Sequence, residues 1–414
     1  MPQSHTTSDR HAANSGDRTR APSRCGLAVV YVGFIVTGVV TTLLGPILPS
    51  LQASWRLSDQ RAGYLFAVQF TASIVGTIVG SELIPRLGFR ISLSVGYALM
   101  AVGISGLALG TWPLALLAVA FHGAGFGWAI PVSNLLVYQI RSSNRAAALN
   151  LLNFAWGVGA VACPLLAGLA QRRSAQEGFL LGVAASAGLI ATLLLALRFE
   201  VANPRARGSR FAQIGELCRQ PFAWMLALTF FLYVGTEASL GGWVADYAKR
   251  ITESSTSWIF TPSFYWAGLM LGRAVAPLFL RRIRDCTLAT AGLALAFLGV
   301  LMLIFASSIA GACAAGGLAG LGLASVYPVT IAQLSRLGAA GQRISGAMFA
   351  IAGCGGACLP WLIGFVSTHA GSLKAGLLVP LIATASMLSL YSLPKVGISM
   401  AKAITEAQPE AVAF

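Results

Sequence analysis

An ionisable side chain stands in the middle of a long apolar stretch in the second half of the sequence. Glu237 falls within residues 223–247, and in a membrane a charge at that depth costs about 3 kcal/mol or more. Tyr233, Glu237 and Gly241 recur every four residues, so a helix carries a phenol, a carboxylate and a gap on one face. This spacing predicts a site that binds a polar ligand and exchanges a proton. The alternative is a glutamate that only joins two helices.

Two asparagines mark a second polar face in an apolar stretch. Asn150, Asn153 and Gly157 are spaced i, i+3 and i+7, which places them on one side of a helix. An amide offers both donors and an acceptor, which suits a neutral ligand rich in hydroxyl groups. We therefore predict that both asparagines contact the ligand. Hydrogen bonding between helices is the alternative.

Four further residues complete the predicted ligand site. Gln69 and Gln333 are polar side chains within apolar stretches, and both are predicted to face a cavity. Trp156 and Tyr327 lie well inside their stretches, away from the membrane interfaces where aromatic residues usually gather. These two rings are predicted to stack on the ligand.

Two residues join Glu237 as candidates for proton coupling. Arg273 lies seven residues after Trp266 on the same helical stripe, so it is predicted to pair with Glu237 or to stack on an aromatic ring. In the alternative interpretation its long side chain reaches the membrane surface. His122 is a relay candidate because imidazole titrates near neutral pH, and a hydrogen-bonded packing role is the alternative.

The composition excludes a soluble globular protein. Hydrophobic residues make up 56% of the chain and charged residues 10%, whereas soluble domains carry about 25% charged residues. The net charge of +15 is spread over short segments between apolar stretches, so the expected partner is a lipid bilayer and not a nucleic acid. The seven cysteines lie mostly in apolar stretches and are predicted to be unpaired.

Apolar stretches of about 20 residues, the length that crosses a bilayer, occur twelve times. Six precede a polar link at 198–222 and six follow it. The predicted fold is an all-α polytopic membrane protein of twelve transmembrane helices in two six-helix halves, 25–197 and 223–393. The stretches are 26–49, 62–84, 91–110, 114–138, 148–170, 178–197, 223–247, 263–280, 287–308, 311–335, 344–368 and 375–393.

Lysine and arginine residues predict that both tails and the link are cytoplasmic. In that orientation 20 basic residues lie on the cytoplasmic side, seven lie on the opposite side, and Arg273 lies within a span. The 1–24 tail lacks a signal-peptide pattern and is predicted to be a disordered cytoplasmic segment. The tail at 394–414 is predicted to lie on the same side.

Labelling of single cysteines from outside the cell tests this topology. A cysteine at Ser254 is expected to react with a membrane-impermeant reagent, whereas a cysteine at Ser209 in the link is expected to stay unlabelled. The reverse pattern would overturn both the orientation and the division into halves.

Glycines and prolines recur in the same order in both halves. Internal repeats of this kind are how secondary transporters build a binding site between two moving halves. Close helix packing alone is the alternative. The matched segments are 76–85 with 268–277, 125–127 with 320–322, and 157–164 with 353–360.

The spans and repeats together resemble the major facilitator superfamily. Residues 81–90, Ser-Glu-Leu-Ile-Pro-Arg-Leu-Gly-Phe-Arg, are similar to its Gly-x-x-x-Asp-Arg-x-Gly-Arg-Arg signature after the second span. Arg86, Gly88 and Arg90 fit that signature, and the resemblance implies that they serve a cytoplasmic gate. Pro85 replaces the aspartate on which the usual gate depends.

Three short segments resemble the fucose permease and related sugar symporters. Tyr233-Val-Gly-Thr-Glu237 is similar to the Tyr-Val-Gly-x-Gln/Glu of their seventh span. Residues 149–153 are similar to a Leu-Asn-Leu-x-Gln segment, and residues 57–63 to a Leu-Ser-x-x-Gln-x-Gly segment. The resemblance implies that the ligand is a sugar.

The sequence departs from these symporters in its first and fourth spans, where they carry acidic residues. The first span offers Thr37, Thr41 and Thr42 instead, and the fourth offers His122. Proton coupling is therefore expected to depend on Glu237 or His122.

The predicted function is secondary active transport of a small hydroxylated solute, by resemblance a sugar, through proton or cation symport. An efflux antiporter for drugs or metabolites is the alternative, although Cys163 replaces a glycine that such antiporters carry in the fifth span. A membrane sensor that no longer transports is a third possibility. Enzyme motifs are missing, so no catalysis, cofactor or metal is expected. We expect a monomer in a bacterial inner membrane.

Overall fold

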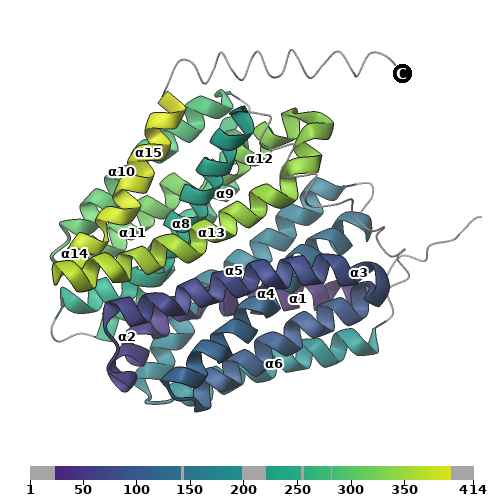
Figure 1. Cartoon of the computed structure of the whole chain (residues 1–414), viewed down its shortest axis with the longest axis horizontal. Helices are drawn as coiled ribbons and strands as arrows, with labels where there is room; N and C mark the ends of the chain where they lie inside the picture. The colour runs from purple at the N-terminus through teal and green to yellow at the C-terminus, as the bar shows by residue number, and fades with distance from the viewer. Residues whose placement is uncertain (1–23, 141–143, 198–220, 253–255, 281, 393–414) are drawn as a thin grey trace, which may run out of the picture.

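The computed structural model describes residues 24–140, 144–197, 221–252, 256–280 and 282–392. The two predicted tails lie outside the described residues except for Arg24, as do Ser209, Ser254 and the link up to residue 220. Figure 1 shows an N-terminal bundle, in purple to teal, packed against a C-terminal bundle, in green to yellow. The two predicted halves thus form two bundles.

The N-terminal half comprises α1 (Arg24–Thr42), α2 (Leu44–Trp55), α3 (Asp59–Leu109), α4 (Trp112–Ile140), α5 (Arg145–Arg172) and α6 (Gln176–Ala196). The C-terminal half comprises α8 (Pro221–Arg250), the 3-10 helix η1 (Thr256–Phe260), α9 (Thr261–Leu280), α10 (Asp285–Ile304), α11 (Ile309–Leu323), α12 (Val326–Arg336), α13 (Gly338–Ala370), α14 (Leu373–Gly376) and α15 (Leu378–Ser392).

Prolines and a glycine interrupt three of these spans. The helices α1 and α2 meet at a bend of 41°, where Pro46 has no N–H to donate to the Thr42 carbonyl. Pro328 likewise cannot donate to Ala324, and α11 gives way to α12 there. The 51 residues of α3 turn at Gly88, whose φ of 71° and ψ of 170° favour glycine.

Twelve spans follow from these helices. Nine described helices are long and apolar enough to cross a membrane, and ten do so when α1 and α2 are taken as one bent span. A straight helix of 51 residues would be about 77 Å long, so α3, turned at Gly88, supplies two spans across a core of about 30 Å. With α9 as the remaining span, each predicted apolar stretch has a helical counterpart.

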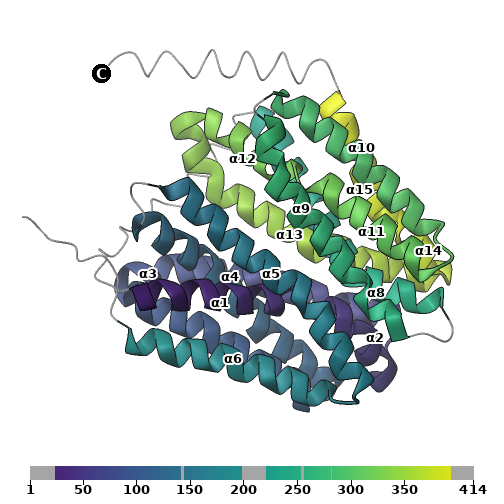
Figure 2. The same ribbon diagram turned by 180° about the vertical axis from the view of Figure 1, so that it is seen from behind.

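The two halves make equivalent internal contacts. In the N-terminal half α1 packs against α5, and α3 packs against α4 and α6. In the C-terminal half α8 packs against α13, α9 and α10 pack against α11, and α10 packs against α15. Between the halves α3 meets α13, α2 meets α8, and α5 runs beside α9 along the boundary (Figure 2).

Glycines that press against carbonyl groups reveal the register of the repeat. A Cβ atom at Gly159 would collide with the Ile35 carbonyl, and a Cβ at Gly355 would collide with the Phe231 carbonyl. Gly355 follows Gly159 by 196 residues, and Phe231 follows Ile35 by the same interval. This agrees with the predicted match of 157–164 with 353–360.

The predicted match of 76–85 with 268–277 is wrong by one helical turn. Gly76 faces the carbonyl of Ala124, and Gly272 faces the carbonyl of Leu321, so Gly76 corresponds to Gly272. Because both segments contain glycines four residues apart, an alignment of letters alone slips easily by one turn.

The predicted match of 125–127 with 320–322 is displaced as well. Gly125 packs on the Met100 amide, and Gly322 packs on the Ala296 amide, so Gly125 corresponds to Gly322. The helix packing, in which each glycine touches one particular neighbour, resolves the ambiguity.

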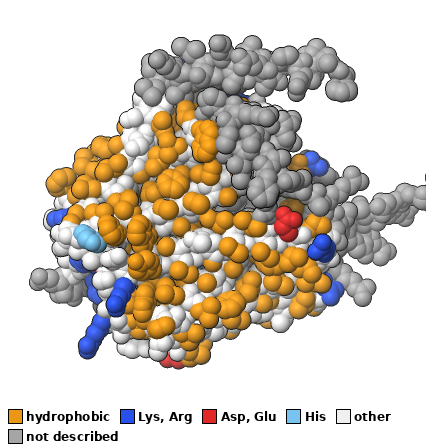
Figure 3. All heavy atoms as spheres, in the orientation of Figure 1, with side chains coloured by type: hydrophobic (Ala, Val, Ile, Leu, Met, Phe, Trp, Pro, Cys, Tyr) orange, Lys and Arg blue, Asp and Glu red, His pale blue; other side chains and the backbone are white. Residues whose placement is uncertain are grey.

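The outer surface is apolar around the middle of the molecule. Figure 3 shows hydrophobic side chains across one face, with lysine and arginine side chains near its two ends. Large exposed residues include Val102, Leu189 and Ile382. A soluble monomer rarely exposes so wide an apolar area, whereas a bilayer requires it.

Candidate functional site

A cavity of about 1780 Å³ lies between the two halves. Its described walls are residues 73–82 of α3, 130–138 of α4, 149–160 of α5, 266–277 of α9, 327–331 of α12 and 346–353 of α13, with Trp224 of α8. These segments lie toward the end of the bundle where α3 turns at Gly88, which we call the open end. A single small ligand needs about 300–1,000 Å³, so the site occupies only part of this volume.

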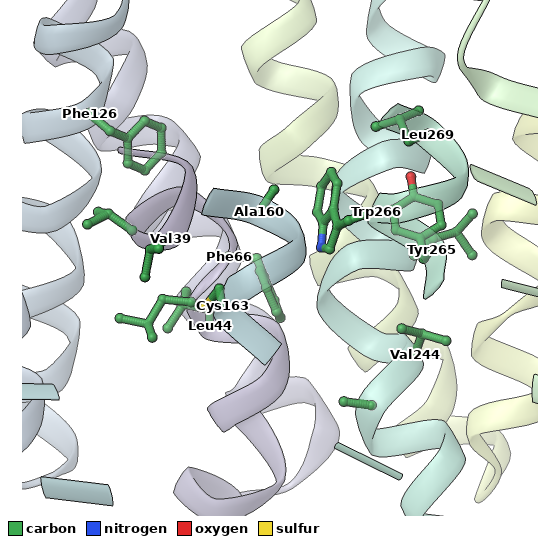
Figure 4. Packing of buried hydrophobic residues seen from close by; sticks show 14 of the residues in the cluster. Val39, Leu44, Phe66, Phe126, Ala160, Cys163, Val244, Tyr265, Trp266 and Leu269 are labelled. Carbon is green, nitrogen blue, oxygen red and sulfur yellow. The ribbon is translucent and has the colours of Figure 1, made fainter. Parts of the chain in front are cut away.

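The deep end of the cavity is a floor of two indole rings. Trp156 of α5 and Trp266 of α9 meet edge to face with centroids 5.6 Å apart. Figure 4 shows Trp266 pointing from α9 toward Ala160 of α5. Just beyond the floor, Ser263 Oγ donates a hydrogen bond of 3.0 Å to the Val161 carbonyl across the two halves.

Beyond this floor, glycines bring the two halves into direct contact, at what we call the closed end. Gly45 of α2 lies against the Gly241 carbonyl of α8. Gly242 lies against the Phe66 ring, and Gly63 of α3 lies against the backbone of Trp361 in α13. Added side chains at these glycines would have to displace the opposite half.

A polar network also joins the halves at the closed end. Arg250 at the end of α8 forms a salt bridge with Asp59 at the start of α3, and its Nη2 lies 2.6 Å from Asp246 Oδ2. Asp59 further accepts hydrogen bonds from Gln52 Nε2, at 2.9 Å, and from Ser367 Oγ of α13. The Asp59 carboxylate of the N-terminal half therefore bonds to two helices of the C-terminal half, α8 and α13.

The predicted site does not include Asp59, Asp246 or Arg250. A usable signal was present, because Asp246 and Arg250 are spaced i, i+4 at the end of an apolar stretch. Asp59 lies in the 57–63 segment that resembles sugar symporters. What links Asp59 to Arg250 is a contact across 191 residues, which no local pattern reveals.

Arg273 is the centre of the charged cluster on the cavity wall. Its Nη2 donates to Tyr233 Oη at 2.9 Å and lies 3.3 Å from Glu237 Oε2. Its guanidinium also lies 5.9 Å from the ring centroid of Trp156 and 6.0 Å from that of Tyr327. The structure thus brings together five of the predicted residues, with Tyr233 and Glu237 behind the wall and the other three on it.

This ion pair has no counterpart in the N-terminal half. In the register of 196 residues, Glu237 corresponds to Thr41 and Arg273 corresponds to Thr77. Thr41 Oγ1 instead accepts a hydrogen bond of 3.0 Å from Trp156 Nε1. The charged chemistry is therefore concentrated on one side of the cavity.

The two predicted asparagines lie on the opposite wall. Asn150 and Asn153 are exposed to the cavity, and Asn153 Nδ2 donates to the Leu149 carbonyl of its own helix at 2.9 Å. Among the described residues no bond from Asn153 to another helix is present. The geometry therefore favours ligand contact over helix pairing for this face.

Three predicted residues are packed inside their own halves, away from the described cavity wall. Gln69 is buried, and its Nε2 lies 3.4 Å from the Thr41 carbonyl. Gln333 is buried with Tyr391, whose hydroxyl lies 3.4 Å from Gln333 Oε1. His122 is fully buried, and its Nε2 lies 2.8 Å from the Val40 carbonyl, which agrees with the packing alternative.

The residues predicted to gate the cytoplasmic side surround the turn of α3. Gly88 forms the turn itself, and Arg86 and Arg90 are exposed on either side of it. They lie at the open end of the cavity, where the two halves are apart in this conformation.

Two repeated helical halves around a cavity that is open at one end and closed at the other define an alternating-access membrane transporter. The sequence model of the Major Facilitator Superfamily matches residues 30–338. The chain belongs to the major facilitator superfamily, which confirms the predicted resemblance.

Related sequences include transporters of sugars. The glucose/galactose transporter of Brucella abortus is 24% identical over 376 residues, which cover 84% of this chain and 89% of that protein. The sodium-dependent glucose transporter 1A of Mus musculus is 22% identical over 295 residues, which cover 60% of this chain and 68% of that protein.

Solved structures share the fold. The fucose:proton symporter of E. coli superposes with a TM-score of 0.61 at 18% identity, over 89% of this chain and 98% of that chain. The nucleoside transporter NupG superposes with a TM-score of 0.74 at 11% identity, over 88% of this chain and 98% of that chain.

Proposed function

We propose that this chain is a proton- or cation-coupled symporter of a small hydroxylated solute, with sugars as the leading class. The observation that carries the proposal is the set of side chains that line the cavity near its floor. The amides of Asn150 and Asn153 and the ring of Trp156, all on α5, line one cavity with the ring of Tyr327 and the guanidinium of Arg273 from the other half. Amides and aromatic faces recognise hydroxyl groups and the apolar faces of a ring, respectively.

The relatives support the same class. The names of the Brucella abortus and mouse proteins state that they transport glucose, and the E. coli structure is that of a fucose:proton symporter. The resemblance of residues 233–237 to this group points in the same direction.

The open end of the cavity is proposed to face the cytoplasm. The basic-residue bias supports this orientation, in which both termini and the link 198–222 are cytoplasmic. We propose that the membrane is a bacterial inner membrane. The structure then represents an inward-open conformation, with the Asp59 network closing the outer end. Transport requires the opposite state, in which this network parts and the halves meet around Gly88.

Glu237 is proposed to carry the coupling proton. Its side chain is 16% exposed, and its charged partner is Arg273 at 3.3 Å. Protonation of Glu237 would release Arg273, so that the charge pair, the ligand and the conformation become linked. His122 is a weaker candidate because its ring is enclosed and bonded to a backbone carbonyl.

Uptake into proteoliposomes tests the function. Purified protein is expected to accumulate glucose, galactose or fucose above the outside concentration when an inward proton or sodium gradient is imposed, and only to equilibrate them without one. Gradient-driven extrusion of these solutes would favour the antiporter alternative, and a failure to bind or move any of them would overturn the proposal.

Asn153→Ala is expected to weaken solute binding more than folding. The amide faces the cavity, so its loss removes ligand hydrogen bonds worth about 0.5–1.5 kcal/mol each, which weakens binding about 2- to 13-fold. Ligand-induced thermal shifts give the affinity, and the melting temperature without ligand reports folding. Asn144→Ala, at the exposed start of the same helix, is the control that should bind normally. Normal binding with a lower melting temperature in the Asn153 variant would assign this residue to helix packing.

A further inference from the structure

Arg273 is one of two charged residues on the described cavity wall, and it lies deep in the cavity. The other, Glu82, is exposed on α3 toward the open end. Beside Arg273 lie the rings of Trp156 and Tyr327, and the two asparagines line the same cavity from α5. A solute that reaches the floor therefore meets the guanidinium of Arg273, whereas the carboxylate of the wall, Glu82, lies toward the open end.

The guanidinium is poorly matched to its own carboxylate. All three hydrogen bonds that it makes to described residues leave from Nη2, and the two bonds to Glu237 measure 3.3 and 3.4 Å. Well-formed contacts between arginine and a carboxylate are about 2.7–2.9 Å long and use two nitrogens in parallel. The Nε of Arg273 is buried and has no hydrogen-bond partner among the described residues.

A second unpaired donor lies on the same helical stripe. Trp266 Nε1 is buried without a partner among the residues that the structure describes, although its ring forms the floor of the cavity. Figure 4 shows this ring on the side of α9 that faces α5. In that figure the indole nitrogen lies at the edge of the ring away from Leu269 and the open end, so of these two residues it is Arg273, on the cavity wall, that can meet acceptor oxygens of a ligand.

We propose that the preferred solute is a hydroxylated monocarboxylate, a sugar acid, whose carboxylate takes the place of Glu237 at Arg273. The hydroxyl groups of the solute then face Asn150 and Asn153, and its ring or chain packs on Trp156. A single arginine matches a single carboxylate, so a monocarboxylate is the expected solute rather than a dicarboxylate. This inference rests on the proposed symport function and specifies its substrate class.

Exchange of one carboxylate for another provides the coupling. With Glu237 ionised, Arg273 is neutralised and an incoming anion is rejected. When Glu237 accepts a proton from the solvent, the site becomes cationic and admits the anion, so one proton and one monoanion cross together as a neutral unit. The titratable groups that interact with Glu237 are Arg273 and Tyr265 of α9, Tyr327 of α12, and Tyr233 of α8. Glu237 is the one carboxylate among these groups, so we assign the exchanged proton to it.

Binding of matched acid and neutral sugars to the purified full-length protein tests the inference. Galacturonate and galactose share one pyranose ring and differ only at C6, and glucuronate and glucose form a second such pair. The acids are expected to bind about tenfold more tightly than the neutral sugars in mildly acidic buffer. This preference should disappear in alkaline buffer, where Glu237 competes. Thermal shift across a concentration series gives each affinity.

Substitutions distinguish the role of the Glu237 carboxylate from that of the carboxylate on the solute. Glu237→Gln is expected to bind the acids equally well at both pH values, and about tenfold more tightly than the unmodified protein in alkaline buffer. The double variant Arg273→Gln/Glu237→Gln removes both charges together and should lose the preference for acids, so that each acid binds no more tightly than its neutral partner.

The outcomes distinguish this inference from the proposed function. Tight binding of neutral sugars with no preference for either acid would refute the sugar-acid assignment and leave sugar transport standing. A preference for the acids that survives in the double variant would also refute it, because Arg273 would not be the anchor. No binding of any of the four sugars would contradict the proposed function as well.

Discussion

Glu237→Gln is expected to abolish uphill accumulation of the solute while preserving solute binding and counterflow exchange. The amide keeps the shape and hydrogen bonding of the carboxylate, but it cannot take up and release a proton. A driven proteoliposome should therefore reach only the outside solute concentration, whatever the size of the proton gradient. Uptake of labelled solute with and without the gradient, together with exchange against unlabelled internal solute, measures both properties.

Glu82→Gln is the matched control for this experiment. Glu82 is an exposed carboxylate on the wall of the same cavity, far along α3 from the floor residues, and it does not pair with Arg273. It should accumulate solute as the unmodified protein does. If the Glu237 variant still concentrates solute against its gradient, the coupling site lies elsewhere, and His122 or a different ion must be considered.

Asp59→Asn is expected to open the closed end of the cavity. The substitution removes the salt bridge between Asp59 and Arg250, so that Arg250 keeps Asp246 as its described carboxylate partner. It also weakens the hydrogen bond that Ser367 donates to residue 59. Because Arg250 is 39% exposed, we expect the closed state to lose only about 1–2 kcal/mol, well below the value for a fully buried pair. That loss shifts the ratio of closed to open molecules about 5- to 30-fold.

A cysteine at Phe66 reports the shift. Phe66 is buried at the closed end against Gly242 and Trp243 of the other half, so it becomes reachable only when the halves part there. With the native cysteines replaced, labelling at this position should be much faster in the Asp59→Asn background. The control is Asp285→Asn, which breaks the salt bridge to Arg336 within the C-terminal half alone. Equal labelling rates in both backgrounds would show that the Asp59 network does not hold the closed end together.

The sequence alone located the spans and the charged residues inside them. A stretch of about 20 apolar residues is a local property that the bilayer thickness imposes, so each of the twelve predicted stretches has a helix in the structure. Glu237 and Arg273 stand out for the same reason, since a charge within such a stretch is costly wherever the helix packs. The pairing of Glu237 with Arg273 was one of the interpretations that the sequence allowed, and the distance of 3.3 Å between Arg273 Nη2 and Glu237 Oε2 supports it.

The rotation of each helix about its own axis could not be predicted from the sequence. Gln69 and Gln333 have the same polar character as Asn150, yet packing turns the glutamines into their own halves and the asparagine onto the cavity wall. The register of the repeat slipped by one turn between Gly76 and Gly268 for the same reason. A pattern of small residues indicates that two helices approach closely. The carbonyl group that each glycine contacts is needed to show which turn of one helix packs on which turn of the other.

Which end of the cavity is closed is decided by tertiary structure alone. Asp59 and Arg250 are ordinary surface-type residues at the ends of two spans, and their separation along the chain hides their contact. The glycines that close this end also look like any other helix-packing glycines until Gly45 lies against Gly241 of the other half. A transporter must make and break such contacts in turn, so they are weak, distributed between two halves, and set by the packing of whole bundles rather than by any one segment.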